Sequence, residues 1–220
     1  MRVGSFSVAG MTGTMSMNQV IHAAVRRDVT RTEQALRTLP DGDTARAREI
    51  RTAWRNLVRE LTHRHEAEDE HVWPFLQSRG VDLTLLEQME SEHVAMKQAL
   101  ASVSTSLDAV VGAPSAINAA AAADEVARAR EVINGHLDHE EHDVEGPMGA
   151  LHDDEEFKAL SKKLRPASPV DAANALAWMQ DGAGEQERSA LRANIPGPVI
   201  TILTLLVARR YRREVAPVWR

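Results

Sequence analysis

Histidine and carboxylate residues recur at regular intervals through the first two thirds of this 220-residue chain. Four histidines are separated by 43, 28 and 43 residues; they are His22, His65, His93 and His136. Asp69 follows His65 by four positions, and Glu140 follows His136 by four, so each pair shares one face of a helix. Imidazole and carboxylate groups together suit first-row transition metals. The pattern predicts a metal site if the fold brings these residues to one level.

The elements that would position these residues are helices. Turn signals at 39–43, 79–80, 112–115 and 146–147 divide the first 150 residues into four long segments. Within the segments, apolar residues recur at three- and four-residue spacing, without strand-like alternation. Asp43 and Asp82 are expected to cap the second and third helices, and Pro74 to kink or end the second one early. The sequence predicts an all-α fold, an antiparallel up-down four-helix bundle with additional short C-terminal helices.

The turn positions predict that the four histidines share one layer of this bundle. In two antiparallel neighbours, residues equidistant from the turn lie at the same height. The midpoints between successive histidines fall at 43.5, 79 and 114.5, each at one of the turns. Burying so many ionisable groups without compensation costs several kcal/mol. A metal site therefore explains the layer better than structural histidines do.

An internal repeat adds the acids to this layer. A shift of 71 residues maps His65 onto His136 and Asp69 onto Glu140. Two acids from opposite helices are placed to bridge two ions between facing helices, about 8–10 Å apart. The sequence thus predicts a dinuclear site.

These residues resemble the hemerythrin-like (HHE cation-binding) family. The resemblance rests on His22, on the run 65–70 followed by Trp73 and Pro74, on residues 92–93 and on the run 136–141, and it covers roughly residues 15–150. It implies a four-helix bundle with two iron ions bridged by two carboxylates and an oxo or hydroxo group. By position, the ligand roles pass to His22, His65, Asp69, His93, His136 and Glu140.

Two departures from the family pattern leave alternatives open. Oxygen-carrying hemerythrins place a second histidine four residues after the one in the third helix, where this chain has Lys97. The fifth imidazole is then missing, supplied by His139 or His63, or replaced by a carboxylate oxygen. The altered ligand set favours chemistry with oxygen, nitric oxide or peroxide over simple oxygen carriage.

The choice of bridging acids is the second open point. Anchoring the repeat on Pro74 and Pro147 gives a shift of 73 residues, which pairs Glu68 with Glu141. The i+4 spacing and the 71-residue repeat favour Asp69 and Glu140, and Glu68 is the main alternative.

The leading functional prediction is a di-iron protein that binds or senses a small oxidant. One alternative is an enzyme with peroxide-decomposing or ferroxidase activity, and another is an iron- or redox-responsive regulatory module with the segment after Pro147 as its readout. The Glu-x-x-His spacing of ferritin-like sites occurs at 68–71 and 90–93, but His22 stands where such a site needs glutamate.

Composition excludes several other classes. The chain has no cysteine, which rules out disulfide scaffolds, cysteine zinc sites and iron–sulfur clusters. A net charge of −6 argues against nucleic-acid binding, and the apolar runs are too interrupted to span a bilayer, so a cytoplasmic location is expected. We expect a flexible tail at 1–14, the bundle at 15–150, and a helical extension at 151–220 packed on it. The last helix is expected from Val199 to about Arg213, with its apolar part docked on the bundle in preference to a membrane surface.

Overall fold

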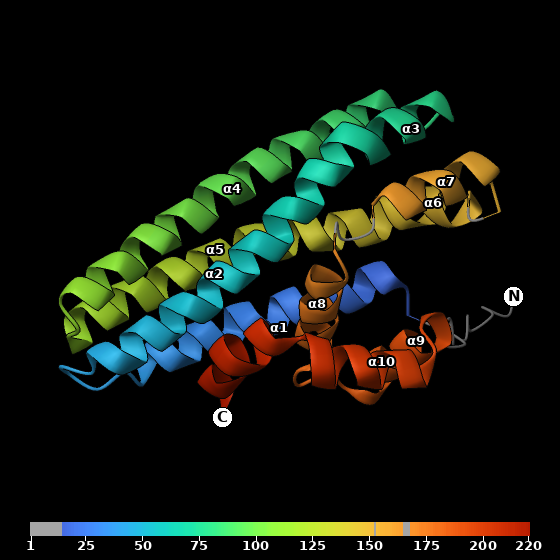
Figure 1. Ribbon diagram of the computed structural model, residues 1–220. Coiled ribbons are helices and arrows are strands. Elements are labelled where there is room, and N and C mark those ends of the chain that lie inside the picture. Colours follow the sequence, from blue (N-terminus) through green and yellow to red (C-terminus); the bar gives the residue numbers. More distant parts are fainter. Residues whose placement is uncertain (1–14, 152, 165–167) are drawn as a thin grey trace, which may run out of the picture.

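Four long helices dominate the computed structural model, which describes residues 15–151, 153–164 and 168–220. Every regular element in these ranges is helical, which confirms the all-helical prediction. The long helices are α1 (Met17–Arg37), α2 (Thr44–Ala67), α4 (Leu83–Gly112) and α5 (Ala116–His139). They lie side by side (Figure 1), and α1 and α4 each pack against both α2 and α5, as in a bundle. The tail expected at 1–14 lies outside the described residues.

Short polar side chains fix where the long helices begin. Ser16, Asp43, Asp82 and Ser115 each accept a hydrogen bond from a backbone N–H of the first turn of α1, α2, α4 and α5, respectively. The predicted caps at Asp43 and Asp82 are thus confirmed. Gly80, at φ 85°, supplies the left-handed conformation of the turn before α4. Local sequence therefore sets the turns that align the helices.

Two π turns interrupt the helices at the carboxylate-rich segments. The turn η1 (Glu68–Val72) joins α2 to α3 (Trp73–Ser78), and η2 (Glu140–Val144) joins α5 to α6 (Glu145–Ala150). The N–H of the residue after each turn bonds to a carbonyl five positions back, at Glu68 and Glu140. Pro74 lies in the first turn of α3, and α2 proper ends at Ala67, well before this proline. Each π turn holds one extra residue, which shifts the helix face of the residues that follow it.

The histidines lie between two separate apolar clusters. A larger cluster fills the bundle on one side and includes Trp54, Leu61 and Met96. A smaller one lies beyond the histidines at the end where α3 and α6 begin; its buried members are Val72, Trp73, Leu76, Leu86, Met89 and Val144. The polar layer is therefore enclosed on both sides by apolar packing.

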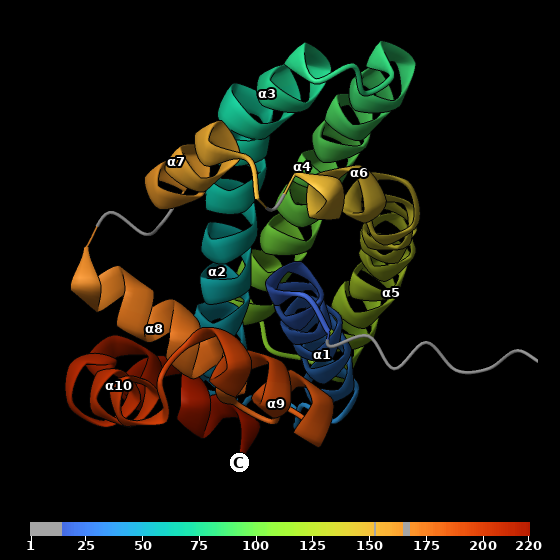
Figure 2. The same cartoon turned by 90° about the vertical axis from the view of Figure 1, so that its right-hand side faces the viewer.

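Further short elements follow α6; the later ones gather beside α1 and α2 (Figure 2), whereas Phe157, in the first of them, packs on Phe75 of α3. The elements are α7 (Glu155–Lys163), α8 (Pro169–Gln180), α9 (Glu185–Asn194), α10 (Gly197–Ile202), the π turns η3 (Leu203–Val207) and η4 (Tyr211–Val215), and the 3-10 helix η5 (Ala216–Trp219). Both α8 and α9 pack on α1, and η4 packs on α2. The expected continuous helix from Val199 to Arg213 is broken at Ala208, whose ψ of 49° leaves the helical range. Ile200 is buried, while Ile202, Leu205 and Leu206 are exposed.

A buried polar contact joins α8 to α1. The indole Nε1 of Trp178 donates to Oδ2 of Asp28 at 2.8 Å, and both side chains are buried. Burial raises the pKa of Asp28 to about 6, although Trp178 and Arg27 favour its charged form. The side chain of Tyr211 donates to Asp181 at 2.9 Å in the same region.

No single helix among the described residues has the length and apolarity that a membrane span requires. By length and composition alone, one pair of helices bent by 110° meets the criterion, Glu185–Asn194 with Gly197–Val207.

Candidate metal centre

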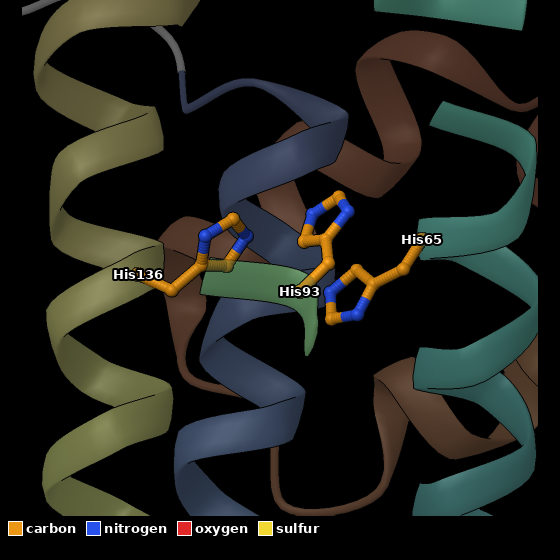
Figure 3. A group of neighbouring side chains, drawn as sticks. All are labelled: His65, His93 and His136. Carbon is orange, nitrogen blue, oxygen red and sulfur yellow. The ribbon is translucent and has the colours of Figure 1, made fainter. Parts of the chain in front are cut away.

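Three imidazoles from three different helices meet inside the bundle. His65 of α2, His93 of α4 and His136 of α5 are all buried, and each offers a ring nitrogen within 4.8 Å of the other two (Figure 3). The rings of His65 and His93 stack at 4.0 Å between centroids, and His136 meets His93 edge-on at 4.7 Å. Three nitrogens at this separation can share one metal ion.

The fourth predicted histidine, His22 of α1, reaches this group through Glu140. Its Nε2 lies 3.1 Å from Oε2 of Glu140, and the same oxygen lies 3.9 Å from Nε2 of His136. The side chains of His22 and Glu140 are almost completely buried. The structure thus brings the four histidines and Glu140 together at one level.

Glu68, and not Asp69, is the buried acid on the opposite side. The side chain of Glu68 is 7% exposed, and its Oε2 lies 3.8 Å from Nε2 of His93. The side chain of Asp69 is 41% exposed and lies on the outer side of the His93 ring, 2.6 Å from Nδ1. Glu68 is the first residue of η1 and Glu140 is the first residue of η2, so the two acids occupy corresponding positions although they follow their histidines by three and four residues. The structure therefore differs from the placement of Asp69 beside Glu140 that the i+4 spacing predicts.

Carboxylates outside the centre hold three of the imidazole rings. Nδ1 of His22 donates to Glu141 at 2.7 Å, and Nδ1 of His136 to Glu92 at 2.9 Å. Asp69 accepts from His93 in the same way, and also from Trp73 Nε1 at 3.1 Å. A carboxylate on Nδ1 places the proton there and leaves the lone pair of Nε2 facing inward.

Six buried donor atoms form no hydrogen bond within the described part of the chain. They are Nε2 of His22, His65, His93 and His136, and Oε2 of Glu68 and Glu140. Buried polar atoms without partners are rare because each costs free energy. Four nitrogens and two oxygens in one enclosed layer are the donor set of a first-row transition metal. The residues present therefore fit a metal centre.

The electrostatic environment favours the neutral, metal-binding form of two of the imidazoles, His65 and His136. Burial lowers the pKa of His65 strongly, and the neighbouring His93 and His136 lower it further. The pKa of His136 is lowered by burial and by His93. Because metal ions bind deprotonated nitrogens, these shifts favour binding at neutral pH.

The sequence analysis missed Arg64, the cation that lies beside both central acids. Its guanidinium contacts Glu68, four residues along the helix, and donates to Oε1 of Glu140 at 3.1 Å. Burial raises the pKa of Glu68 in spite of Arg64. At Glu140 burial acts in the same direction, but Arg64 and His22 outweigh it and lower the pKa. The i, i+4 spacing of Arg64 and Glu68 is the one signal in the sequence that indicates this contact.

The remaining candidate ligands lie outside the centre. His139 bonds through Nδ1 to Glu92 at 2.8 Å, and its Nε2 lies 3.2 Å from Asp143. His63 and Lys97 are exposed. Glu90 is exposed as well, so the ferritin-like spacing at 90–93 is not assembled into the site. A fifth imidazole is therefore absent from the centre among the described residues.

Comparison with known proteins yields one match. The family model for the hemerythrin HHE cation binding domain matches residues 20–146, which is more than half of the chain. This range contains the four buried histidines and both central acids. Searches of curated proteins and of solved structures found no significant match.

Proposed function

The chain belongs to the hemerythrin HHE cation-binding domain family, and on this basis we propose that it is a non-haem di-iron protein that binds or senses a small oxidant. Oxygen, nitric oxide and peroxide are the candidate ligands. The observation that carries the proposal is the set of six buried donor atoms without hydrogen-bond partners. Iron, when bound, supplies the redox chemistry.

We assign the ligand atoms from their burial and direction. Nε2 of the four layer histidines and Oε2 of Glu68 and Glu140 would hold the metal. Asp69, which the sequence favoured as a ligand, instead fixes the ring of His93, as Glu141 fixes that of His22. Two acids from opposite helices then face each other across the centre, as a bridged ion pair requires.

The surrounding residues support the site without binding the metal. The outer carboxylates hold the rings of His22, His93 and His136 in one orientation, which raises the basicity of the inner nitrogen. Trp73 stacks on His93 with ring centroids 5.9 Å apart and closes one side of the layer. The apolar cluster around Leu76 and Met89 limits access of water from the same end of the bundle.

The antiparallel up-down order of α1, α2, α4 and α5 belongs to this proposal. Short connections at residues 38–43 and 113–115, and the packing of each long helix on two others, support it. In that order, the histidines contributed by successive helices meet at one height.

Metal analysis and optical spectroscopy test the proposal directly. Protein loaded with Fe²⁺ without oxygen should bind up to two iron ions per chain, as a dinuclear bundle site requires. Oxygen, nitric oxide or peroxide should then change its near-ultraviolet and visible spectrum. Turnover of peroxide by the loaded protein would mark it as an enzyme. A single zinc ion, with no iron bound at any concentration and no spectral response, would refute the proposal.

A regulatory role is the second candidate, and one observation favours it. The extension contacts α1, the helix that carries His22, through the buried pair of Asp28 and Trp178. A movement of His22 on metal binding would then be transmitted along α1 to Asp28 and so to Trp178 of α8. The test is limited proteolysis of metal-free and iron-loaded protein: a rate of cleavage after residue 168 that depends on metal supports the role, and equal rates refute it.

A further inference from the structure

Arg64 is the cation that joins the two central carboxylates. One guanidinium nitrogen, Nη2, lies 3.1 Å from Oε1 of Glu140 and also contacts Oε1 of Glu68. Asn18 donates to the same Glu140 oxygen at 3.1 Å. Both Oε1 atoms are thus engaged, while both Oε2 atoms have no hydrogen-bond partner. The acids offer one free oxygen each to the layer of histidines.

This arrangement suits one metal ion better than two. A carboxylate that bridges two ions through its two oxygens has both oxygens occupied by metal. With Arg64 in place, Glu68 and Glu140 each keep a single oxygen for metal. A second divalent ion at the Oε1 positions would also lie close to the guanidinium charge, and like charges at contact distance repel strongly inside a protein.

We propose that Arg64 is a built-in cation that competes with the second metal ion. In the metal-free protein it neutralises buried carboxylates whose charge would otherwise be uncompensated. The first ion binds to the free Oε2 atoms and imidazoles with Arg64 in place. The second ion binds only when the guanidinium releases Glu68 and Glu140. This inference rests on the proposed metal function and concerns how the site fills.

The sequence repeat shows that the chain provides this cation once. The shift of 71 residues that maps His65 onto His136 maps Arg64 onto Gly135, which has no side chain to offer. A single guanidinium already reaches both acids. The side chain of Arg64 is 17% exposed, so it has a path along which to withdraw toward solvent.

Anaerobic titration with Fe²⁺ of the full-length protein and three variants tests the inference. Arg64→Met removes the charge and keeps much of the stem. Arg64→Lys keeps a charge that reaches one carboxylate at a time. Arg55→Met, an exposed arginine on the same helix, is the matched control. Calorimetry gives the affinity of each step, and thermal unfolding gives the stability of each form.

Two separated binding steps are expected for the wild type and for Arg55→Met. In Arg64→Met the second step should tighten by roughly tenfold or more, within the usual range of coupling between sites. The metal-free form of this variant should melt at a lower temperature, and iron should raise its melting temperature by more than in the wild type. Arg64→Lys should fall between the two.

A second step in Arg64→Met that is as weak as in the wild type, or weaker, would overturn the inference, since the guanidinium would then organise the acids for metal. If the metal-free Arg64→Met does not fold, Arg64→Lys takes its place: a second step no tighter than in the wild type would overturn the inference. Absence of iron binding in the wild type and in Arg55→Met alike would refute the metal function itself. The two failures are therefore distinguishable.

Discussion

Exchanging the acids at positions 68 and 69 one at a time tests the ligand assignment. The two residues are neighbours in sequence, yet Glu68 lies in the layer of histidines and Asp69 lies on the outer side of the His93 ring. Glu68→Gln and Asp69→Asn each remove one negative charge with little change in size. A difference between the two variants therefore reports position and not total charge.

The magnitudes follow from what each carboxylate contacts. Asp69 holds Nδ1 of His93 at 2.6 Å, and loss of such an outer partner weakens metal binding by about 10- to 100-fold, or about 1.4–2.7 kcal/mol. In the proposed assignment, Glu68 contributes a donor atom itself. Its amide replacement is a neutral, weaker ligand, so we expect loss of more than about 100-fold and fewer than two ions per chain at saturation.

The assay is equilibrium binding of Fe²⁺ to metal-free protein without oxygen, with circular dichroism to confirm folding. The other half of the repeat provides matched controls. Glu140→Gln should behave as Glu68→Gln does, because both side chains are buried at the centre. Glu141→Gln should behave as Asp69→Asn does, because Glu141 holds Nδ1 of His22.

One result would refute this reasoning. If Asp69→Asn empties the site while Glu68→Gln retains both ions, Asp69 is the ligand and the helix after His65 has a different register in solution. The i+4 assignment from the sequence would then hold.

Three further predictions concern other parts of the molecule. Glu92→Gln frees the ring of His136 and should weaken iron binding by about 10- to 100-fold, measured in the same titration. Burial raises the pKa of Asp28 to about 6, above the value of about 3.9 in unfolded chains, so its ionisation should destabilise the fold as pH rises from about 4 through 6. Asp28→Asn should remove this decline, worth up to about 3 kcal/mol, in urea unfolding at several pH values; an unchanged slope would contradict the burial argument. Deleting residues 199–220 removes the buried Tyr211 and Val215 and should lower the melting temperature by at least about 5 °C, with binding to anionic liposomes unchanged. The docking prediction would be contradicted if the intact protein bound liposomes, the truncated protein did not, and both melted at the same temperature.

The layer of histidines was predictable because short turns constrain helix register. Asp43 and Asp82 cap their helices as expected, so the midpoints between histidines fall at real turns. The structure places the ring nitrogens of His65, His93 and His136 within 4.8 Å of one another, as that register predicts. A helix N-cap depends on the side chain at the helix start, so it can be recognised from the local sequence alone.

The identity of the inner acid was not predictable from spacing. The rule that residues four apart share a face holds for an α-helix, and both acidic segments are π turns. Residues three and four positions after a histidine both lie near its face of an α-helix, so spacing alone does not choose between Glu68 and Asp69. Pro74 and Pro147, one after each turn, were the available signal that the helix is irregular there.

The last helix was mispredicted for a related reason. Apolar residues run from Val199 to Val207, which predicts one continuous helix, but the chain turns at Ala208 to bury Tyr211 beside α8. The backbone N–H of Tyr211 donates to the buried side chain of Asn174 at 2.9 Å, a contact 37 residues apart in sequence. Tertiary contacts of this kind leave no periodic signal.

Departures from the repeat give the two halves of the centre different chemistry. Glu92 fixes the ring of His136, but the residue that the 71-residue shift pairs with Glu92 is Ile21, which has no acceptor to offer His65. Arg64 lies next to His65, and its counterpart is Gly135. One half therefore has an additional carboxylate, and the other an additional cation. A carboxylate strengthens its imidazole as a ligand, whereas a nearby cation disfavours a second positive ion. Two positions that differ in both respects would fill one after the other, which is the order that competition by Arg64 requires.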